Sequence, residues 1–258
     1  MIMKKIVQNF LNTFGYQLSK TETVSATNLD KIAKLLISKT EPTIFDVGAN
    51  MGESIQRYKN LYPKSKIHSF EPNKDENDKL IVKYKNYKEI YFNNFAIGEK
   101  EGNSDFYINA ISGHSSFNDI IPNTQWLKAR SRTAGVDSKN YTIKKVNTRI
   151  STLDNYCEKN KIEQIDLLKI DTQGYEDKVL EGASKLLKSG KIKFIQLELI
   201  FSEVYRNTLS IYDVEKHLIP NKYKLFATTP AGSLSQNYKY QVEHVYISRD
   251  LYENFKKR

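Results

Sequence analysis

The sequence predicts a doubly wound α/β fold, Rossmann-like, with a seven-stranded and mostly parallel sheet. Three observations predict it. Short apolar stretches alternate with helical patterns from about residue 28 onward, which is the order of βαβ units. A turn containing two glycines, at residues 48–52, follows the first apolar stretch. Polar residues follow the later apolar stretches, where the strand ends of open α/β sheets bind ligands.

The elements follow one another in a regular order. Apolar residues at helical spacing predict a helix near 29–36, and the first strand is expected at Thr43–Val47. Further strands are expected at 67–70, 90–97, 165–170 and 194–199, with helices at 53–62, 74–85, 176–188 and 211–218. The last two strands, near 222–228 and 242–248, have only a turn-rich stretch between them. We therefore expect the final strand to run antiparallel at the end of the sheet.

The chain divides into an N-terminal helical extension, residues 1–40, and one domain, residues 41–258. Apolar residues within 3–14 share one helical face before Gly15. Docking on the domain is the default for this helix; pairing with another subunit and peripheral membrane contact are the alternatives. Residues 99–150 interrupt the alternation of strand and helix, with strands expected at 105–108 and 141–148 and a polar stretch between them. We interpret them as an insertion near the mouth of the site.

Composition limits the functional classes. The single cysteine, Cys157, excludes an intrachain disulfide and a cysteine-built zinc site, and we expect it to be a half-buried helical residue. No stretch reaches the run of about 18 apolar residues that a membrane helix needs. The first residues lack a small-residue cleavage site, so the expected location is the cytoplasm. The net charge of +10 comes from scattered lysines, which indicate a solvated surface more than a nucleic-acid partner. The densest basic stretch, residues 128–145, can meet an anionic substrate.

The first informative segment is Phe45-Asp46-Val47-Gly48-Ala49-Asn50-Met51-Gly52. Gly48 and Gly52 let the backbone turn sharply and approach a ligand closely. A dinucleotide-binding loop would show G-x-G-x-x-G here, whereas this spacing is G-x-x-x-G, without the lysine of a phosphate-binding loop. The loop favours a ligand that has no phosphates between its two ends.

Two further polar positions follow the next strands. Glu71, before Pro72, can accept both ribose hydroxyls of an adenosine, a role shared by NAD and S-adenosyl-methionine enzymes. Asn94 follows the third strand and can contact the adenine edge. Each residue alone is compatible with a turn, an exposed carboxylate or a cap. Their order at successive strand ends favours a nucleoside site.

A second constellation lies at residues 165–176 and 198. An apolar strand brings Asp171 to its tip, Gly174 permits a tight turn, and Glu176 begins the next helix. Glu176 also suits the helix dipole, so a purely structural role is open. Glu198 lies at the end of the following strand. Two carboxylates there can act as a general base, bind the ammonium of methionine, hold substrate hydroxyls or share a metal.

These segments together resemble the FkbM family of methyltransferases. The matching stretches are 45–52, 70–72, 94–97, 166–176 and 179–183. The resemblance implies the class I methyltransferase variant of the fold, S-adenosyl-methionine as donor, and O-methylation of a hydroxyl on a sugar, glycan precursor or other small molecule. It also implies residue roles. Asp46, Gly48, Asn50 and Gly52 would line the methionine side of the donor, Glu71 with Pro72 would hold the ribose, Asn94 would lie near the adenosine, and Asp171 would lie at the reaction end.

Methyl transfer to oxygen needs an aligned hydroxyl and a group that removes its proton. Asp171 is the first candidate, with Glu198 and Glu176 behind it. His114 is a further candidate because a neutral imidazole suits the task, and a structural role fits it equally well. A divalent metal on Asp171, Glu198 and a histidine is not expected, because no two ligands show a close metal spacing.

Three other functions compete with small-molecule O-methylation. A nucleic-acid methyltransferase would suit the positive charge, yet the sequence has neither an Asn-Pro-Pro-Tyr motif nor a Pro-Cys pair after a strand. A dehydrogenase disagrees with the glycine spacing. A non-catalytic S-adenosyl-methionine-binding protein would use the same loop. The sequence leaves the oligomeric state open.

Overall fold

The computed structural model describes residues 27–230, 232–235 and 238–257. The helix expected within residues 3–14 lies outside these ranges. Within them, no helix is both long and apolar enough to cross a membrane.

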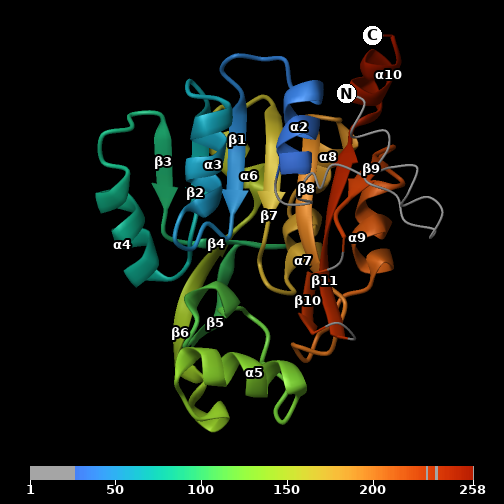
Figure 1. Ribbon diagram of the computed structural model, residues 1–258. Helices are drawn as coiled ribbons and strands as arrows, with labels where there is room; N and C mark the ends of the chain where they lie inside the picture. The colour runs from blue at the N-terminus through green and yellow to red at the C-terminus, as the bar shows by residue number, and fades with distance from the viewer. Residues whose placement is uncertain (1–26, 231, 236–237, 258) are drawn as a thin grey trace, which may run out of the picture.

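The described chain is built on one large twisted sheet with helices on both faces (Figure 1). Its strands are β1 (Thr43–Val47), β2 (Lys66–Phe70), β3 (Ile90–Asn93), β7 (Ile165–Ile170), β8 (Ile192–Ile200), β9 (Lys224–Thr228), β10 (Gly232–Ser235) and β11 (Tyr238–Ile247). The order across the sheet is β10-β11-β8-β7-β1-β2-β3, and β9 pairs with β11 along the same edge as β10. Strands β3, β2, β1, β7 and β8 are parallel, and β11 is antiparallel to β8. The predicted doubly wound, mostly parallel sheet with a terminal antiparallel hairpin is confirmed.

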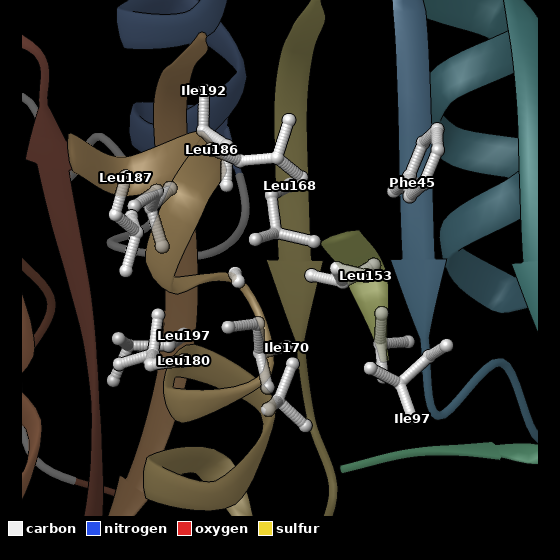
Figure 2. Close-up of a cluster of buried hydrophobic side chains, with 14 of the residues drawn as sticks. Phe45, Ile97, Leu153, Leu168, Ile170, Leu180, Leu186, Leu187, Ile192 and Leu197 are labelled. Carbon is white, nitrogen blue, oxygen red and sulfur yellow. The ribbon is translucent and has the colours of Figure 1, made fainter. Parts of the chain in front are cut away.

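Helices cover the two faces of the sheet in two groups. They are α2 (Thr27–Leu36), α3 (Glu53–Leu61), α4 (Lys74–Lys83) and α10 (Arg249–Lys256) on one side, and α6 (Leu153–Lys159), α7 (Glu176–Glu181), α8 (Ser184–Lys188) and α9 (Ile211–Leu218) on the other. Neighbouring strand residues point to opposite layers: Phe45 and Leu168 belong to the α6–α9 core (Figure 2), and Ile44 and Leu167 belong to the other. The central strands β1 and β7 are therefore buried on both faces, and most of their residues are apolar.

The final strand is antiparallel as expected, but its predicted place at the end of the sheet is wrong. β11 lies between β8 and β9, one position in from the edge. Its residues Val245, Tyr246 and Ile247 are fully buried. Such an apolar stretch gains more from an interior position, with a strand on each side, than from an edge.

Residues 99–150 are more ordered than the predicted polar stretch suggested. The expected strand 90–97 ends at Asn93, and β4 (Ala96–Ile97) instead pairs with β6 (Thr142–Ser151) in a second sheet that also holds β5 (Gly102–Asn109). Between β5 and β6 lie η1 (Ser112–His114), α5 (Gln125–Ala134) and η2 (Ser138–Asn140).

Helix α5 has its own start and stop signals and a buried face. Thr124 caps its first turn by accepting a hydrogen bond from the Leu127 N–H, and Gly135 ends it in the left-handed conformation. Trp126 and Leu127 are buried against Tyr205, which lies beyond β8. A separate small core therefore holds the insertion against the carboxyl end of the main sheet.

Two local expectations need correction. The helix predicted over 176–188 is divided into α7 and α8 at Gly182. A Cβ on Gly182 would lie 2.0 Å from the carbonyl oxygen of Gly98, so the helix breaks where two backbone segments touch. Cys157 is helical as expected, but it is buried rather than half-buried.

Candidate active site

One pocket lies at the carboxyl ends of β1, β2 and β7, beneath the insertion. It encloses about 610 Å³ of space, its open mouth included. Its wall consists of Val47, Gly48, Asn50, Phe70, Glu71, Pro72, Ala96, Ile97, Phe106, Ser112, Gly113, Ser115, Phe117, Asp171, Thr172, Gln173 and Tyr175. The predicted residues that reach this wall are Gly48, Asn50, Glu71, Pro72 and Asp171. The carboxyl ends of the strands are the edge at which open α/β sheets bind their ligands.

The loop after β1 holds three strand ends together. The N–H groups of Gly48 and Ala49 both donate to the Phe70 carbonyl at the end of β2, at 3.0 and 3.1 Å. Gly48 has φ +85°, and a Cβ on it would lie 1.9 Å from the carbonyl oxygen of Asp171, after β7. Glycine is therefore required here for both its conformation and its lack of a side chain. Asn50 continues the loop and accepts a hydrogen bond of 2.8 Å from the Ser112 hydroxyl of the insertion.

Glu71 is a buried carboxyl group held by backbone donors. The Asn50 N–H donates to its Oε2 at 2.7 Å, and the Asn73 N–H donates to its Oε1 at 2.8 Å. Burial raises the pKa of Glu71 to about 7, although these two hydrogen bonds favour the ionised form. Each oxygen of the ionised group keeps a further lone pair, so the carboxylate can accept hydrogen bonds from two hydroxyl groups of a ligand in the pocket.

Gly52 and Asn94, two residues predicted to line the donor site, lie behind the pocket wall. Gly52 begins α3 in the left-handed conformation, and a Cβ on it would lie 2.6 Å from Leu80 and 2.8 Å from Tyr84. The Asn94 amide donates to the carbonyl oxygens of Glu71 and Pro72, at 2.9 and 3.2 Å. Gly52 permits close packing, and Asn94 holds the turn that carries Glu71.

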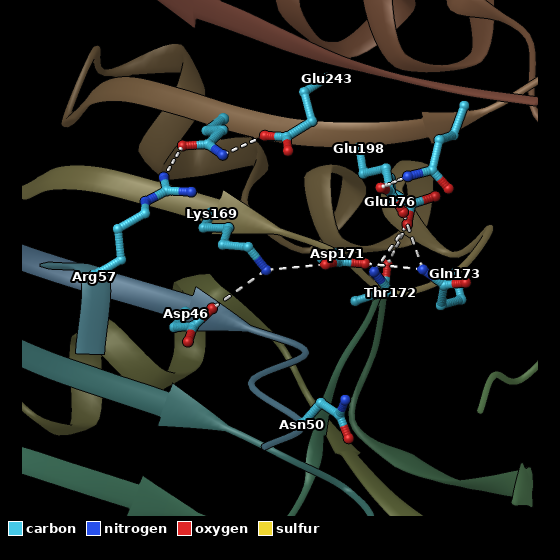
Figure 3. A network of polar contacts seen from close by, with 12 residues as sticks. Asp46, Asn50, Arg57, Lys169, Asp171, Thr172, Gln173, Glu176, Glu198 and Glu243 are labelled. Atoms are coloured by element: carbon cyan, nitrogen blue, oxygen red, sulfur yellow. Dashed lines mark hydrogen bonds and ion pairs between the residues drawn. The ribbon is translucent and has the colours of Figure 1, made fainter. Parts of the chain in front are cut away.

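A buried lysine links two of the predicted carboxylates (Figure 3). The Lys169 ammonium donates to Asp171 Oδ2 at 3.1 Å and lies 3.6 Å from Asp46 Oδ1. Burial disfavours its charge, but the carboxylates of Asp171 and Asp46 outweigh burial and raise the pKa of Lys169. Burial also disfavours the charged form of Asp46 and so raises its pKa. Asp46 is fully buried, and its oxygens accept no hydrogen bond from the described residues. Sequence reasoning missed Lys169, although a lysine inside an otherwise apolar strand was a signal for it.

Gln173 joins Asp171 to Glu198, the other carboxylate predicted at a neighbouring strand tip (Figure 3). Its side-chain Nε2 donates to Asp171 Oδ1 at 2.9 Å and to Glu198 Oε2 at 3.1 Å. Glu198 also accepts a hydrogen bond of 2.7 Å from Gln241 on β11. Burial, followed by the charge of Asp171, raises the pKa of Glu198. The structure thus brings Asp171 and Glu198 together, with Asp171 on the pocket wall and Glu198 behind it.

Glu176 organises the loop between β7 and α7. Its carboxylate accepts hydrogen bonds from the N–H groups of Thr172 and Gly174, at 2.9 and 3.0 Å. Burial raises its pKa to about 7. It does not line the pocket, which agrees with the structural alternative left open for it.

His114 also stands off the pocket wall. Its Nδ1 lies 2.6 Å from the Tyr141 hydroxyl, and its ring packs on Trp126 with the ring centroids 4.8 Å apart. Burial, assisted by the charge of Arg130, lowers the pKa of His114 to about 4, so its imidazole is neutral at pH 7. No group of three or more His, Cys, Asp or Glu side chains in the described ranges is arranged to hold a metal ion.

The charges on the pocket wall suit a particular kind of ligand. Among the described residues that line it, Glu71 and Asp171 are acidic and none is Lys or Arg. Such a wall can bind hydroxyl groups and cations, and two acidic side chains without a cationic one disfavour a pyrophosphate. The arrangement fits an adenosine linked to a cationic centre better than a dinucleotide.

Comparisons with known proteins agree with this chemistry. The family described as "Methyltransferase FkbM domain" matches residues 46–240, a range that includes the whole pocket wall and Glu198. The 2-O-methyltransferase NoeI of Sinorhizobium fredii (strain NBRC 101917 / NGR234) is 27% identical over 207 residues, which cover 76% of this chain and 78% of that protein.

Similar solved structures include an rRNA methylase from Streptococcus thermophilus, with a TM-score of 0.47 and 11% identity over 89% of this chain and 99% of that one. Aeropyrum pernix fibrillarin in complex with S-adenosyl-L-methionine has a TM-score of 0.44 and 10% identity, covering 81% of this chain and 67% of that one.

Proposed function

The chain belongs to the FkbM methyltransferase family, and from this premise we propose that it transfers a methyl group to a hydroxyl oxygen of a sugar, glycan precursor or other small molecule. The methyl donor of this class of enzyme is S-adenosyl-methionine. The observation that carries the proposal is a single pocket in which Gly48, Glu71 and Asp171 meet at three neighbouring strand ends. The two acidic side chains of the described wall, with no Lys or Arg among its residues, disfavour the pyrophosphate of a dinucleotide.

We assign the two ends of the pocket to the two ends of the donor. The buried Glu71 carboxyl group would accept the ribose hydroxyls, beside the apolar wall of Ala96 and Ile97 for the adenine. Gly48 and Asn50 would face the methionine part, which ends at Asp171. Asp46, Gly52 and Asn94 would act indirectly, by holding the loops that carry these residues.

The donor supplies an electrophilic methyl group on a sulfonium. Transfer forms a bond between carbon and the acceptor oxygen as the bond between carbon and sulfur breaks, and the hydroxyl proton leaves to a base. Asp171 is the candidate base on the described wall that lies at the reaction end. Glu198, Glu176 and His114 stand behind it and would support the site rather than touch the acceptor.

One finding supports an oxygen acceptor: the name of the relative from Sinorhizobium fredii specifies 2-O-methyl transfer.

The test is a transfer assay with methyl-labelled S-adenosyl-methionine and a panel of sugars, each paired with a deoxy sugar that lacks one hydroxyl. The proposal expects label on a sugar and loss of that label in one deoxy partner. Asp171→Asn is expected to reduce the rate by about 10²- to 10⁴-fold, the usual contribution of a general base. Label on RNA alone would favour the nucleic-acid alternative. Donor binding without transfer to any acceptor, unchanged in Asp171→Ala, would favour a non-catalytic binding protein.

A further inference from the structure

The side chain of Gln173 makes more specific contacts than a residue that only shapes the loop backbone would need. It is buried, and its residue adopts a left-handed conformation with φ +57°. Its amide nitrogen donates to both Asp171 and Glu198, and its amide oxygen lies 3.0 Å from the Tyr205 hydroxyl. Every polar atom of this side chain is therefore used, and each bond reaches a different residue.

The neighbouring elements fix the Gln173 amide in one orientation. Carboxylates only accept hydrogen bonds, so the amide nitrogen faces Asp171 and Glu198, and the amide oxygen faces the Tyr205 hydroxyl. Tyr205 is almost fully buried, and its hydroxyl also lies 2.9 Å from the His114 carbonyl oxygen, which holds the ring beside the amide. The Ser116 hydroxyl of the insertion donates to the Gln173 carbonyl at 2.8 Å and holds the backbone as well.

We infer that Gln173 is a positioning residue of the reaction centre: its amide nitrogen holds Asp171 Oδ1 while Lys169 holds Oδ2, and the two together aim the carboxylate into the pocket. The inference rests on the proposed function, because it assigns Asp171 to the reaction end. Glu198 is the second anchor of the amide. A glutamine suits this position because it is neutral and offers two donors to two acidic neighbours, whereas a glutamate would add a third negative charge.

Exchanging the amide of Gln173 and the carboxylate of Glu198 distinguishes a positioning role of Gln173 from a purely structural one. Gln173→Glu keeps the shape of the side chain, removes both donors and adds a charge. Adding Glu198→Gln restores the net charge and a hydrogen bond between positions 173 and 198. The double variant still leaves Asp171 Oδ1 without its amide donor.

The measurements are the thermal unfolding midpoint and the Kd values of S-adenosyl-methionine and S-adenosyl-homocysteine by calorimetry. The two ligands differ only in the methyl group and the sulfonium charge, so the ratio of their Kd values reports on the reaction end. We expect Gln173→Glu to lower the midpoint and the double variant to recover most of it. We also expect the double variant to raise the ratio of the S-adenosyl-methionine Kd to the S-adenosyl-homocysteine Kd about tenfold above its wild-type value, because Asp171 is free to turn away.

The matched control is Gln56→Glu, an exposed change of the same kind on α3, which should alter neither the midpoint nor the ratio. A double variant that recovers both the midpoint and the wild-type ratio would overturn the inference, because Gln173 would then be only structural. A double variant that stays as unstable as Gln173→Glu would overturn the hydrogen-bond bridge itself. Failure of the proposed function would look different: the wild-type protein would bind neither ligand, or would bind both and transfer label to none of the sugars, whatever the ratio of Kd values in the variants.

Discussion

Glu71 combines opposing influences on one carboxyl group. Burial favours its neutral form, whereas the N–H groups of Asn50 and Asn73 favour its charged form, and burial prevails to leave a pKa of about 7. Hydroxyl groups of a bound ribose would donate to the carboxylate and stabilise the charged form. Ligand binding should therefore release a proton from this residue near neutral pH.

We predict that S-adenosyl-homocysteine binds more tightly as the pH rises from about 6 to 8, with a slope of at most about tenfold per pH unit below the pKa. The sign follows from the raised pKa: below pH 7 the neutral acid dominates, and binding must first remove its proton. Calorimetry in buffers of different ionisation enthalpy measures both the affinity and the released proton. Glu71→Gln should bind more weakly and lose this pH dependence; an equal slope in that variant would contradict the assignment.

Lys169 has the opposite character, a cation that the buried carboxylate of Asp46 and the half-buried carboxylate of Asp171 hold in place. We predict that Lys169→Met lowers the free energy of unfolding by about 3–5 kcal/mol, because it leaves Asp46 buried without its counter-ion. Urea unfolding measures this loss, and adding Asp46→Asn should recover part of it.

Lys39→Met is the matched control for this prediction. The Lys39 side chain is 52% exposed, and Asp166, its partner, keeps a hydrogen bond from the Thr43 N–H. This control should lower the free energy of unfolding by less than about 1 kcal/mol. Equal losses in the two variants would mean that Lys169 is not the buried counter-ion described above.

At the scale of elements, the turn after β1 fixes how closely the strand ends approach one another. Gly48→Ala would place a Cβ against the Asp171 carbonyl, which is backbone and cannot rotate away. We predict that this variant weakens S-adenosyl-homocysteine binding by at least about tenfold, because β1 and β7 must separate at the pocket. Calorimetric titration measures the effect.

Gly190→Ala provides the comparison for that turn. Gly190 is also left-handed, with φ +64°, but nothing lies within 4 Å of an added Cβ. It should cost only the backbone strain of about 1–2 kcal/mol and leave the ligand affinity unchanged. Loss of affinity in Gly190→Ala equal to that in Gly48→Ala would show that backbone strain alone, and not the close approach, controls the pocket.

The elements also differ in how well the sequence predicts them. Strands such as β1 and β7 are buried on both faces, so their apolar residues identified them, and the residues that follow, Gly48 and Asp171, line the pocket. The direction of a side chain beyond the strand end depends on contacts distant in sequence. The sequence therefore did not predict that Asn94 donates to the Glu71 carbonyl, or that Gln173 forms hydrogen bonds with Glu198 on β8 and with Tyr205.

The second sheet was harder to foresee for a related reason. β4 has only two residues, and its partner β6 begins more than forty residues later, so no local pattern announced the pair. Helix α5 buries only a narrow face, Trp126 and Leu127, within a polar sequence. The helix is stabilised mainly by packing against Tyr205, which is distant in the sequence, and less by the intrinsic helix preference of its own residues.

At the scale of the whole molecule, the pocket joins the insertion to the main sheet. Phe106 and Phe117 of the insertion face the same space as Glu71 and Asp171, and hydrogen bonds such as Ser116 to Gln173 cross between the two parts. We therefore propose that residues 41–258 act as one cooperative unit, with the insertion as part of the ligand site.

We predict one unfolding transition for this unit and an increase of about 2.7 kcal/mol in the free energy of unfolding when S-adenosyl-homocysteine is present at 100 times its Kd. Differential scanning calorimetry measures both quantities. An insertion that unfolds separately, at a temperature that the ligand does not change, would contradict a shared site.

We assign this pocket to an adenosine linked to a methionine and not to a dinucleotide. The decisive experiment is a calorimetric titration of the wild-type protein with S-adenosyl-homocysteine, with NAD as the comparison ligand. The structure predicts stoichiometric binding of S-adenosyl-homocysteine, weakened in Glu71→Gln, and no heat from NAD. Binding of NAD, or of neither ligand, would contradict the assignment of the pocket and of the reaction together.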